Sequence, residues 1–441
     1  MIKLSDHFTY KSLFRFTYSS ILMLLFSSIY GIVDGFFVSN YVGKTPFAAL
    51  NFIMPVLMIL GCIGFMFGTG GSAIISKLFG EKNNQKANEI FSMNIFVSVA
   101  LSIILGVLGF IFLPQIGYLL GARGEMLSYS AIYGRIIIAA LPFYILQYEF
   151  QCLFATSEKP KMGLYVTLAA GFANMILDWL FVAVFSFGLV GAAVATAISQ
   201  FVGGIIPLIY YLRKNTSLLR LCKFKFDGKA LLKTCTNGSS EFMSNISMSL
   251  VSMLYNYQLM KYAGEDGVAA YGVLMYVSMI FQAIFIGYSV GVAPIVGYNY
   301  GSSNNNELKS ILKKSFVVIG VCSLFMFLAG EIFSRPLTKI FVSYDENLLS
   351  LTSKAFKIFS FSFLFSGISI FGSSFFTALN NGLISALISF LRCLVFQVVA
   401  VIVFPLIWKI DGIWFSIVFS EIMSVCTTIC FLVIKKKKYN Y

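Results

Sequence analysis

Charge and histidine are both scarce in this sequence. Charged residues make up only 11% of the chain, and His7 is its one histidine. Enzyme active sites generally gather histidine, paired acids beside a nucleophile, or a set of metal ligands in one place. Here the acids are spread along the chain, so the composition argues against an integral membrane enzyme such as an acyl or glycosyl transferase.

The eight cysteines contain no CxxC pair, and most of them lie inside apolar segments. Such cysteines behave as small apolar side chains, so neither a metal site nor a disulfide is expected. The formal net charge of +14 does not indicate a nucleic-acid partner. The basic residues that produce it lie in short segments between apolar runs, where they act as topology signals.

What the sequence has in abundance is apolar surface. Hydrophobic residues make up 58% of the chain, and the mean hydropathy is +0.86, whereas soluble domains are about 45–50% apolar. Stretches of about 20 apolar residues, long enough to cross a bilayer as helices, recur along the chain. We therefore predict an all-α integral membrane protein of about twelve transmembrane helices. The predicted spans lie near 13–38, 51–79, 91–117, 127–153, 160–184, 188–212, 239–261, 267–300, 310–333, 349–376, 384–408 and 411–434.

Most of the 32 Lys and Arg residues fall on one side of these spans. The loop from Arg213 to Lys233 and the tail from Lys435 to Lys438 contribute most strongly. Because basic loops stay on the cytoplasmic side, we predict a multi-pass protein of the plasma (inner) membrane with both termini in the cytoplasm.

The chain also matches itself at an offset of 221 residues, which places Gly43 on Gly264, Gly80 on Gly301, and Gly191 on Gly412. One offset that holds from the first to the last span of each half indicates an internal repeat. Two six-span halves of the same orientation leave a cleft between them, as in transporters that work by alternating access. A channel is less favoured, because the repeat does not suggest a ring of subunits around a pore.

The predicted organisation has four parts. It comprises an N-terminal six-helix lobe over residues 1–212, a basic cytoplasmic linker over 213–238, a C-terminal lobe over 239–434 and a basic cytoplasmic tail over 435–441.

Five segments near span ends carry recognisable patterns: IYGIVDGFFVSNYVGKTPFAAL (29–50), GTGGSAIISKLFGEKNNQKA (68–87), LFATSEKPKMG (153–163), FGLVGAAVATAIS (187–199) and YSVGVAPIVGYNYGS (288–302). Together they resemble the multidrug and toxic compound extrusion (MATE) transporters, in the branch with an acidic pair in the N-terminal lobe. The resemblance covers nearly the whole chain. It implies two pseudo-symmetric six-helix lobes that form a V-shaped cleft and export bulky amphipathic or cationic organic compounds in exchange for Na⁺ or H⁺.

The expected protein is thus a secondary active transporter and not an enzyme. We expect a monomer with no cofactor beyond the coupling ion, Na⁺ or H⁺, and with small organic substrates and membrane lipids as its partners. The alternative is a flippase for a lipid-linked or polysaccharide precursor from the same superfamily. A flippase usually has a basic cleft, whereas the arginines placed in the spans, Arg135 and Arg392, do not form an evident functional cluster.

Carboxylates inside the membrane are costly, so each needs a reason to be there. Asp34 and Asp178 lie at similar depth in the first half, with Asn174 one helical turn before Asp178, and Thr196 at a matching level. These four side chains form an all-oxygen set suited to a hard monovalent cation such as Na⁺, or to a proton shared between two acids. The resemblance implies the same four residues as the cation- or proton-binding site.

The resemblance also implies that a set of polar and aromatic residues of the first lobe lines the substrate cleft. They are Tyr30, Tyr133, Gln147, Gln151 and Gln200, to which Glu149 is added as a residue that a cationic compound could meet. In the second lobe, Arg392 and Glu421 are expected to pair and stabilise the fold. A second-lobe ion site is not expected, because spans eight and ten lack acids and Glu241 lies only at the entrance to span seven.

Overall fold

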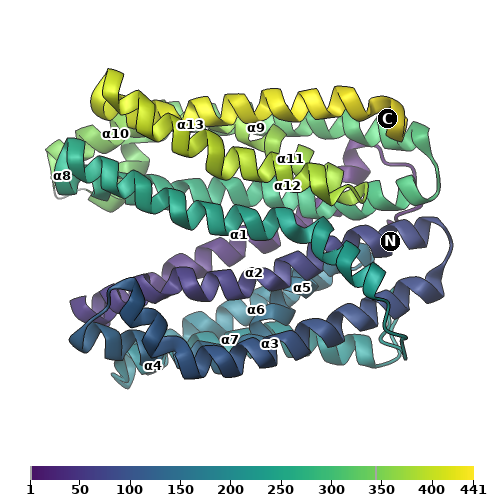
Figure 1. Cartoon of the computed structure of the whole chain (residues 1–441), viewed down its shortest axis with the longest axis horizontal. Helices are drawn as coiled ribbons and strands as arrows, with labels where there is room; N and C mark the ends of the chain where they lie inside the picture. The colour runs from purple at the N-terminus through teal and green to yellow at the C-terminus, as the bar shows by residue number, and fades with distance from the viewer. Residues whose placement is uncertain (1, 343–344) are drawn as a thin grey trace.

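A computed structural model describes residues 2–342 and 345–441, and this part of the chain contains helices and no strands. The helices form two lobes that lie side by side (Figure 1). The first lobe comprises α1 (Tyr10–Tyr41), α2 (Lys44–Gly80), α3 (Asn84–Leu120), α4 (Gly124–Ala139), α5 (Leu141–Thr156), α6 (Pro160–Asp178), the π-helix η1 (Trp179–Val184) and α7 (Gly188–Leu212). The second comprises α8 (Gly228–Gly301), α9 (Asn305–Val342), α10 (Glu346–Ser360), α11 (Phe363–Ala378), α12 (Gly382–Phe390), the π-helix η2 (Leu391–Val395) and α13 (Phe396–Tyr439).

Eight helices in the described residues are long and apolar enough to cross a membrane, or ten if each of two bent pairs counts as one span. Two of the eight, Gly228–Gly301 with 74 residues and Gly382–Tyr439 with 58, far exceed the roughly 20 residues of one crossing. Each contains a break in the helical backbone, at Gly264 and at Trp408–Lys409. Both breaks fall between predicted spans, so each long helix provides two crossings.

The fourth predicted span, 127–153, is not one straight helix. It consists of α4 and α5, which meet at a bend of 60°. Pro142 lies in the first turn of α5, where its missing N–H group and fixed φ favour the start of a new helix.

Helix α8 begins within the predicted linker 213–238. Helix α8 begins at Gly228, because the carboxylate of Asp227 caps it by accepting a hydrogen bond from the backbone N–H of Ala230 at 3.0 Å. Only residues 213–227 form the connection between the lobes.

Many large apolar side chains are exposed, as a lipid-facing surface requires. Leu119, Phe325, Leu383 and Leu406 have exposed fractions of 82%, 72%, 81% and 72%. Exposure on this scale is unfavourable in water but favourable against lipid chains. The chain is accordingly a multi-pass membrane protein.

Backbone geometry repeats between the lobes at the offset of 221. Gly43 and Gly264 both have positive φ, and so do Lys82 and Ser303.

Both termini lie at one end of the molecule, which we call the terminal end (Figure 1). There Gly80 faces the carbonyl of Tyr298, and Gly301 faces the carbonyl of Lys77, each so closely that an added Cβ would lie 2.0 Å from the oxygen. The lobes therefore meet backbone to backbone at this end, through symmetry-related glycines.

Candidate functional site

Helices α1, α6 and α7 of the first lobe carry the four residues of the predicted acidic site. Asp34 lies on α1, Asn174 and Asp178 on α6, and Thr196 on α7. Asp34 is within side-chain interaction range of both Asp178 and Thr196. Asp34, Asn174 and Asp178 are buried, with exposed fractions of 7%, 1% and 0%.

Tyr133 on α4 belongs to the same group, since it interacts with Thr196, Asp34 and Asp178. The family resemblance implied that it lines the substrate cleft. In the structure it is fully buried and within electrostatic range of both acids.

The polar atoms of this group lack hydrogen-bond partners among the described residues. They are Asp34 Oδ1, both carboxylate oxygens of Asp178, both amide atoms of Asn174, the Thr196 hydroxyl and the Tyr133 hydroxyl. None of the groups that interact with Asp34 or Asp178 in the described part of the chain is cationic. Buried carboxylates with neither a counter-ion nor hydrogen bonds are strongly unfavourable in their ionised form.

The corresponding place in the second lobe holds a neutral hydrogen-bonded network instead of acids. Tyr255, which the repeat aligns with Asp34, donates a hydrogen bond to Gln397 Oε1 at 2.6 Å and lies 2.9 Å from the Ser416 hydroxyl. This neutral network satisfies its own polar groups. The two lobes therefore differ in chemistry although their backbones match.

Helix α6 ends at Asp178 and continues as the π-helix η1. Such wider turns interrupt the regular backbone ladder and occur frequently at functional sites. Here the π-helix η1 begins directly after Asp178.

The other predicted cleft residues lie among the helices of the first lobe. Gln147 on α5 donates to the Tyr30 hydroxyl at 3.4 Å and packs against Gly203 of α7, where an added Cβ would clash with it. Gln151 and Gln200 are buried, and each has a polar atom without a partner.

Glu149 has a different setting. It is fully buried, and its Oε2 accepts a hydrogen bond from Ser98 of α3 at 2.6 Å. It thus faces α3 rather than Asp34. Its second oxygen, Oε1, has no partner.

The predicted pairing of Arg392 with Glu421 is confirmed. Arg392 Nε lies 3.0 and 2.9 Å from the two carboxylate oxygens, and both side chains are largely buried. Arg392 also lines a cavity of about 130 Å³ between the lobes, together with Glu241.

A cleft between the two halves was predicted, but most of the residues that line this cavity were not. Its other polar lining consists mainly of hydroxyls and amides from both lobes: Thr69, Ser72, Ser244, Asn245, Gln282, Ser289, Ser369, Ser373, Ser374, Thr377 and Ser389. One sequence feature could have predicted this polar lining: serine and threonine recur at helical spacing within the apolar segment 366–389.

Two six-helix halves with a polar cavity between them and an acidic group in one half define a secondary transporter fold. The MatE family model matches residues 19–180 and again residues 242–403. These two matches cover most of the chain and reproduce its internal repeat. The chain therefore belongs to the MatE family, and it is a transporter and not an enzyme.

Named relatives and solved structures agree with this assignment. The chain is 27% identical to the multidrug export protein MepA of Staphylococcus saprophyticus, over 92% of this chain and 88% of MepA. It is 26% identical to MepA of Staphylococcus aureus strain MRSA252, over 96% and 93% of the two chains.

Among solved structures, an outward-facing multidrug resistance MATE family transporter matches with a TM-score of 0.93 at 19% identity, over 98% of this chain and 96% of the other. A second structure, from Pyrococcus furiosus, matches with a TM-score of 0.90 at 19% identity over 98% and 97%. That transporter is described as having a binding pocket of reversed polarity, which suggests a different function. The fold alone therefore does not determine what is transported.

Proposed function

We propose that this protein is a multidrug exporter that exchanges inward-moving Na⁺ or H⁺ for small amphipathic or cationic organic compounds. The observation that carries the proposal is the pair of buried acids, Asp34 and Asp178, which interact with each other and lack a cationic partner in the described part of the chain. The similarity to the MepA multidrug export proteins supports the export of organic compounds. The flippase alternative receives no support from these relatives.

The donor set fits either coupling ion. Two carboxylates, the Asn174 amide oxygen and the Thr196 hydroxyl are hard oxygen ligands, which suit Na⁺. A proton shared between the two acids would also remove their mutual repulsion. We infer that loading this site and binding an organic compound favour different arrangements of the lobes, which couples the two fluxes.

The cavity between the lobes supports alternation between states. Its volume of about 130 Å³ is below the roughly 300–1,000 Å³ of pockets that hold drug-sized molecules. We infer that the lobes must rearrange before an organic compound can bind there. With both termini cytoplasmic, the state with the terminal end closed faces outward.

The test is efflux of ethidium or norfloxacin from cells that express the chain, with the Na⁺ and proton gradients collapsed in turn. Asp34→Asn and Asp178→Asn should abolish gradient-dependent efflux, because each removes one of the two negative charges that bind the cation. Tyr255→Phe is the matched control in the second lobe and should retain coupled efflux. Normal coupled efflux by both aspartate variants would exclude these residues as the coupling site.

A further inference from the structure

The N-terminal segment, residues 2–9, lies across both lobes at the terminal end. Chain ends are usually disordered unless specific contacts hold them. Here Leu4 and Phe8 are fully buried and belong to the same apolar cluster as Leu308 and Ile311 of α9. We call this segment the N-terminal strap.

The strap is anchored to the first lobe at two points. It continues directly into α1, where Phe8 packs edge-on against Phe16 at a ring-centroid distance of 5.9 Å. The backbone N–H of Leu4 donates a hydrogen bond to Glu158 Oε1, in the turn between α5 and α6, at 2.7 Å. Any motion of the first lobe therefore carries the strap with it.

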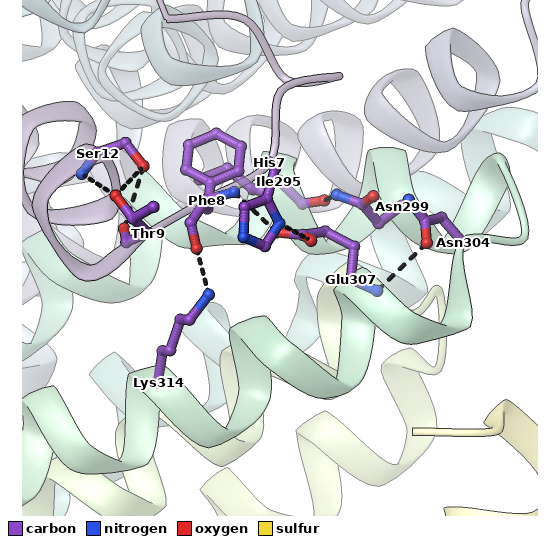
Figure 2. Close-up of polar contacts among 9 residues, drawn as sticks. All are labelled: His7, Phe8, Thr9, Ser12, Ile295, Asn299, Asn304, Glu307 and Lys314. Carbon is purple, nitrogen blue, oxygen red and sulfur yellow. Dashed lines mark hydrogen bonds and ion pairs between the residues drawn. The ribbon is translucent and has the colours of Figure 1, made fainter.

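The strap is bound to the second lobe by Glu307 and Lys314 of α9 (Figure 2). Glu307 Oε1 accepts from the backbone N–H of Phe8 at 2.9 Å, and Oε2 lies 2.6 Å from His7 Nδ1. Lys314 donates to the Phe8 carbonyl. Three contacts from two residues of α9 thus hold two consecutive residues of the strap.

Glu307 is well placed for this role. It lies in the first turn of α9, where the helix dipole favours a carboxylate. Its own backbone N–H is satisfied by Asn304 Oδ1 at 3.2 Å, so its side chain is not needed as a cap. Glu307 is only 7% exposed, and a buried carboxylate that lost these hydrogen bonds would be unfavourable.

We propose that the strap latches the two lobes together at the terminal end, with Glu307 as its receptor, and so stabilises the state in which this end is closed. The contacts to α9 cross between the lobes. They must break when the lobes separate at the terminal end, whereas the contact with Glu158 can persist. This inference rests on the proposed function in one respect: the two lobes must alternate between a closed and an open terminal end.

The experiment measures distance and not transport, so its outcome is independent of which ion or compound is carried. Spin labels on non-canonical amino acids replace Lys161 of α6 and Lys309 of α9, which are exposed and belong to opposite lobes. Double electron–electron resonance on purified protein in lipid nanodiscs then gives the distribution of distances between the two labels. From it follow the populations with the terminal end closed and open. Hydrogen exchange at the amides of Leu4 and Phe8 reports whether the strap is bound.

Glu307→Ala should raise the ratio of open to closed populations roughly tenfold, which corresponds to about 1.4 kcal/mol, and should expose both amides to exchange. Deletion of residues 2–8 should produce the same shift and leaves every helix intact. Glu89→Ala is the matched control, because Glu89 of α3 accepts only from Gln85 on its own helix. An unchanged distance distribution in both the Glu307 variant and the deletion would overturn the proposal, as would unprotected strap amides in the unmodified protein.

Discussion

Asp34 and Asp178 are placed where each makes the folded protein less stable. This destabilisation is confined to the first lobe, because the corresponding position of the second lobe holds Tyr255 in a neutral network whose hydrogen bonds are satisfied. Ionisable residues inside a membrane protein are costly and are therefore candidates for a functional role. The site should therefore trade stability for the ability to bind and release a cation.

Replacing Asp178 by Asn should accordingly not lower the thermal stability of the detergent-solubilised protein, because the amide removes a buried charge at nearly the same volume. If the site takes Na⁺, this ion should stabilise the unmodified protein by about 2.7 kcal/mol at a concentration one hundred times its Kd, and the variant should lose that gain. Thermal melts in NaCl against choline chloride at equal ionic strength measure both effects. An equal Na⁺-dependent shift in the variant would place the ion elsewhere.

The acidic residues of the site were predictable from the sequence, because membrane depth and helical spacing determine where they lie. The spacing of Asn174 and Asp178 places both on one face of a helix, and Asp34 stands alone in an apolar run. The participation of Tyr133 beside the acids could not be derived in this way. It depends on how α4 packs against α2, α3 and α7, which no local pattern encodes.

Helices α2 and α8 form the closest contact between the lobes, and glycine makes it possible. At Gly301 an added Cβ would meet the backbone carbonyl of Lys77 at 2.0 Å, and a backbone carbonyl cannot move aside as a side chain can. The symmetry-related Gly80 faces Tyr298 in the same way. These contacts close the terminal end together with the strap.

Gly301→Ala should therefore destabilise the closed terminal end by about 1–3 kcal/mol, as overpacking generally does. Gly272→Ala is a suitable control, because nothing lies within 4 Å of an added Cβ in the same helix α8. The control should be neutral or stabilising by up to about 1 kcal/mol, since alanine favours helix. Thermal melts of the two variants give the comparison, and equal behaviour would contradict the packing argument.

The linker over 213–227 is held on the first lobe by several contacts with α3. Asp227 pairs with Lys86 at 2.8 Å, and the backbone N–H groups of Arg220 and Cys222 donate to Asn88 and Ser92. The hydrogen bond from Lys86 is the main cause that lowers the pKa of Asp227 below its usual 3.8. Folding therefore favours the ionised form of this carboxyl.

The sign of the pH effect follows from that lowered pKa. The stabilisation is complete above the usual pKa of 3.8 and is lost as the pH falls through the lower value of the folded protein. Asp227→Asn should cost less than about 1 kcal/mol at pH 7, because the pair is partly exposed, and asparagine still caps α8. The difference between the two proteins in thermal melts should begin to shrink as the pH falls below about 3.8 and should vanish only below the lower pKa of the folded protein. A difference that does not change with pH over this range would rule out the ion pair as its source.

At the scale of the whole molecule, the repeat and the number of crossings were predictable because apolar run length and the matched glycines Gly43 and Gly264 are local signals. A cleft between the lobes followed from the same repeat, but the residues that line the cavity there did not. Thr69 and Ser373 both line it, although they lie far apart in the sequence. The strap was hidden for a similar reason, since His7 in the sequence is only a lone histidine ahead of the first span.

The orientation of the molecule in the membrane is the remaining prediction at this scale, and a native residue can test it. Cys222 is exposed and lies in the basic linker between the lobes. With the linker in the cytoplasm, a membrane-impermeant maleimide should label Cys222 in inside-out vesicles but not in intact cells. Cys222→Ser provides the background from the other cysteines. Labelling that depends on Cys222 in intact cells would show that the topology is the reverse of the predicted one. The state closed at the terminal end would then face inward instead of outward.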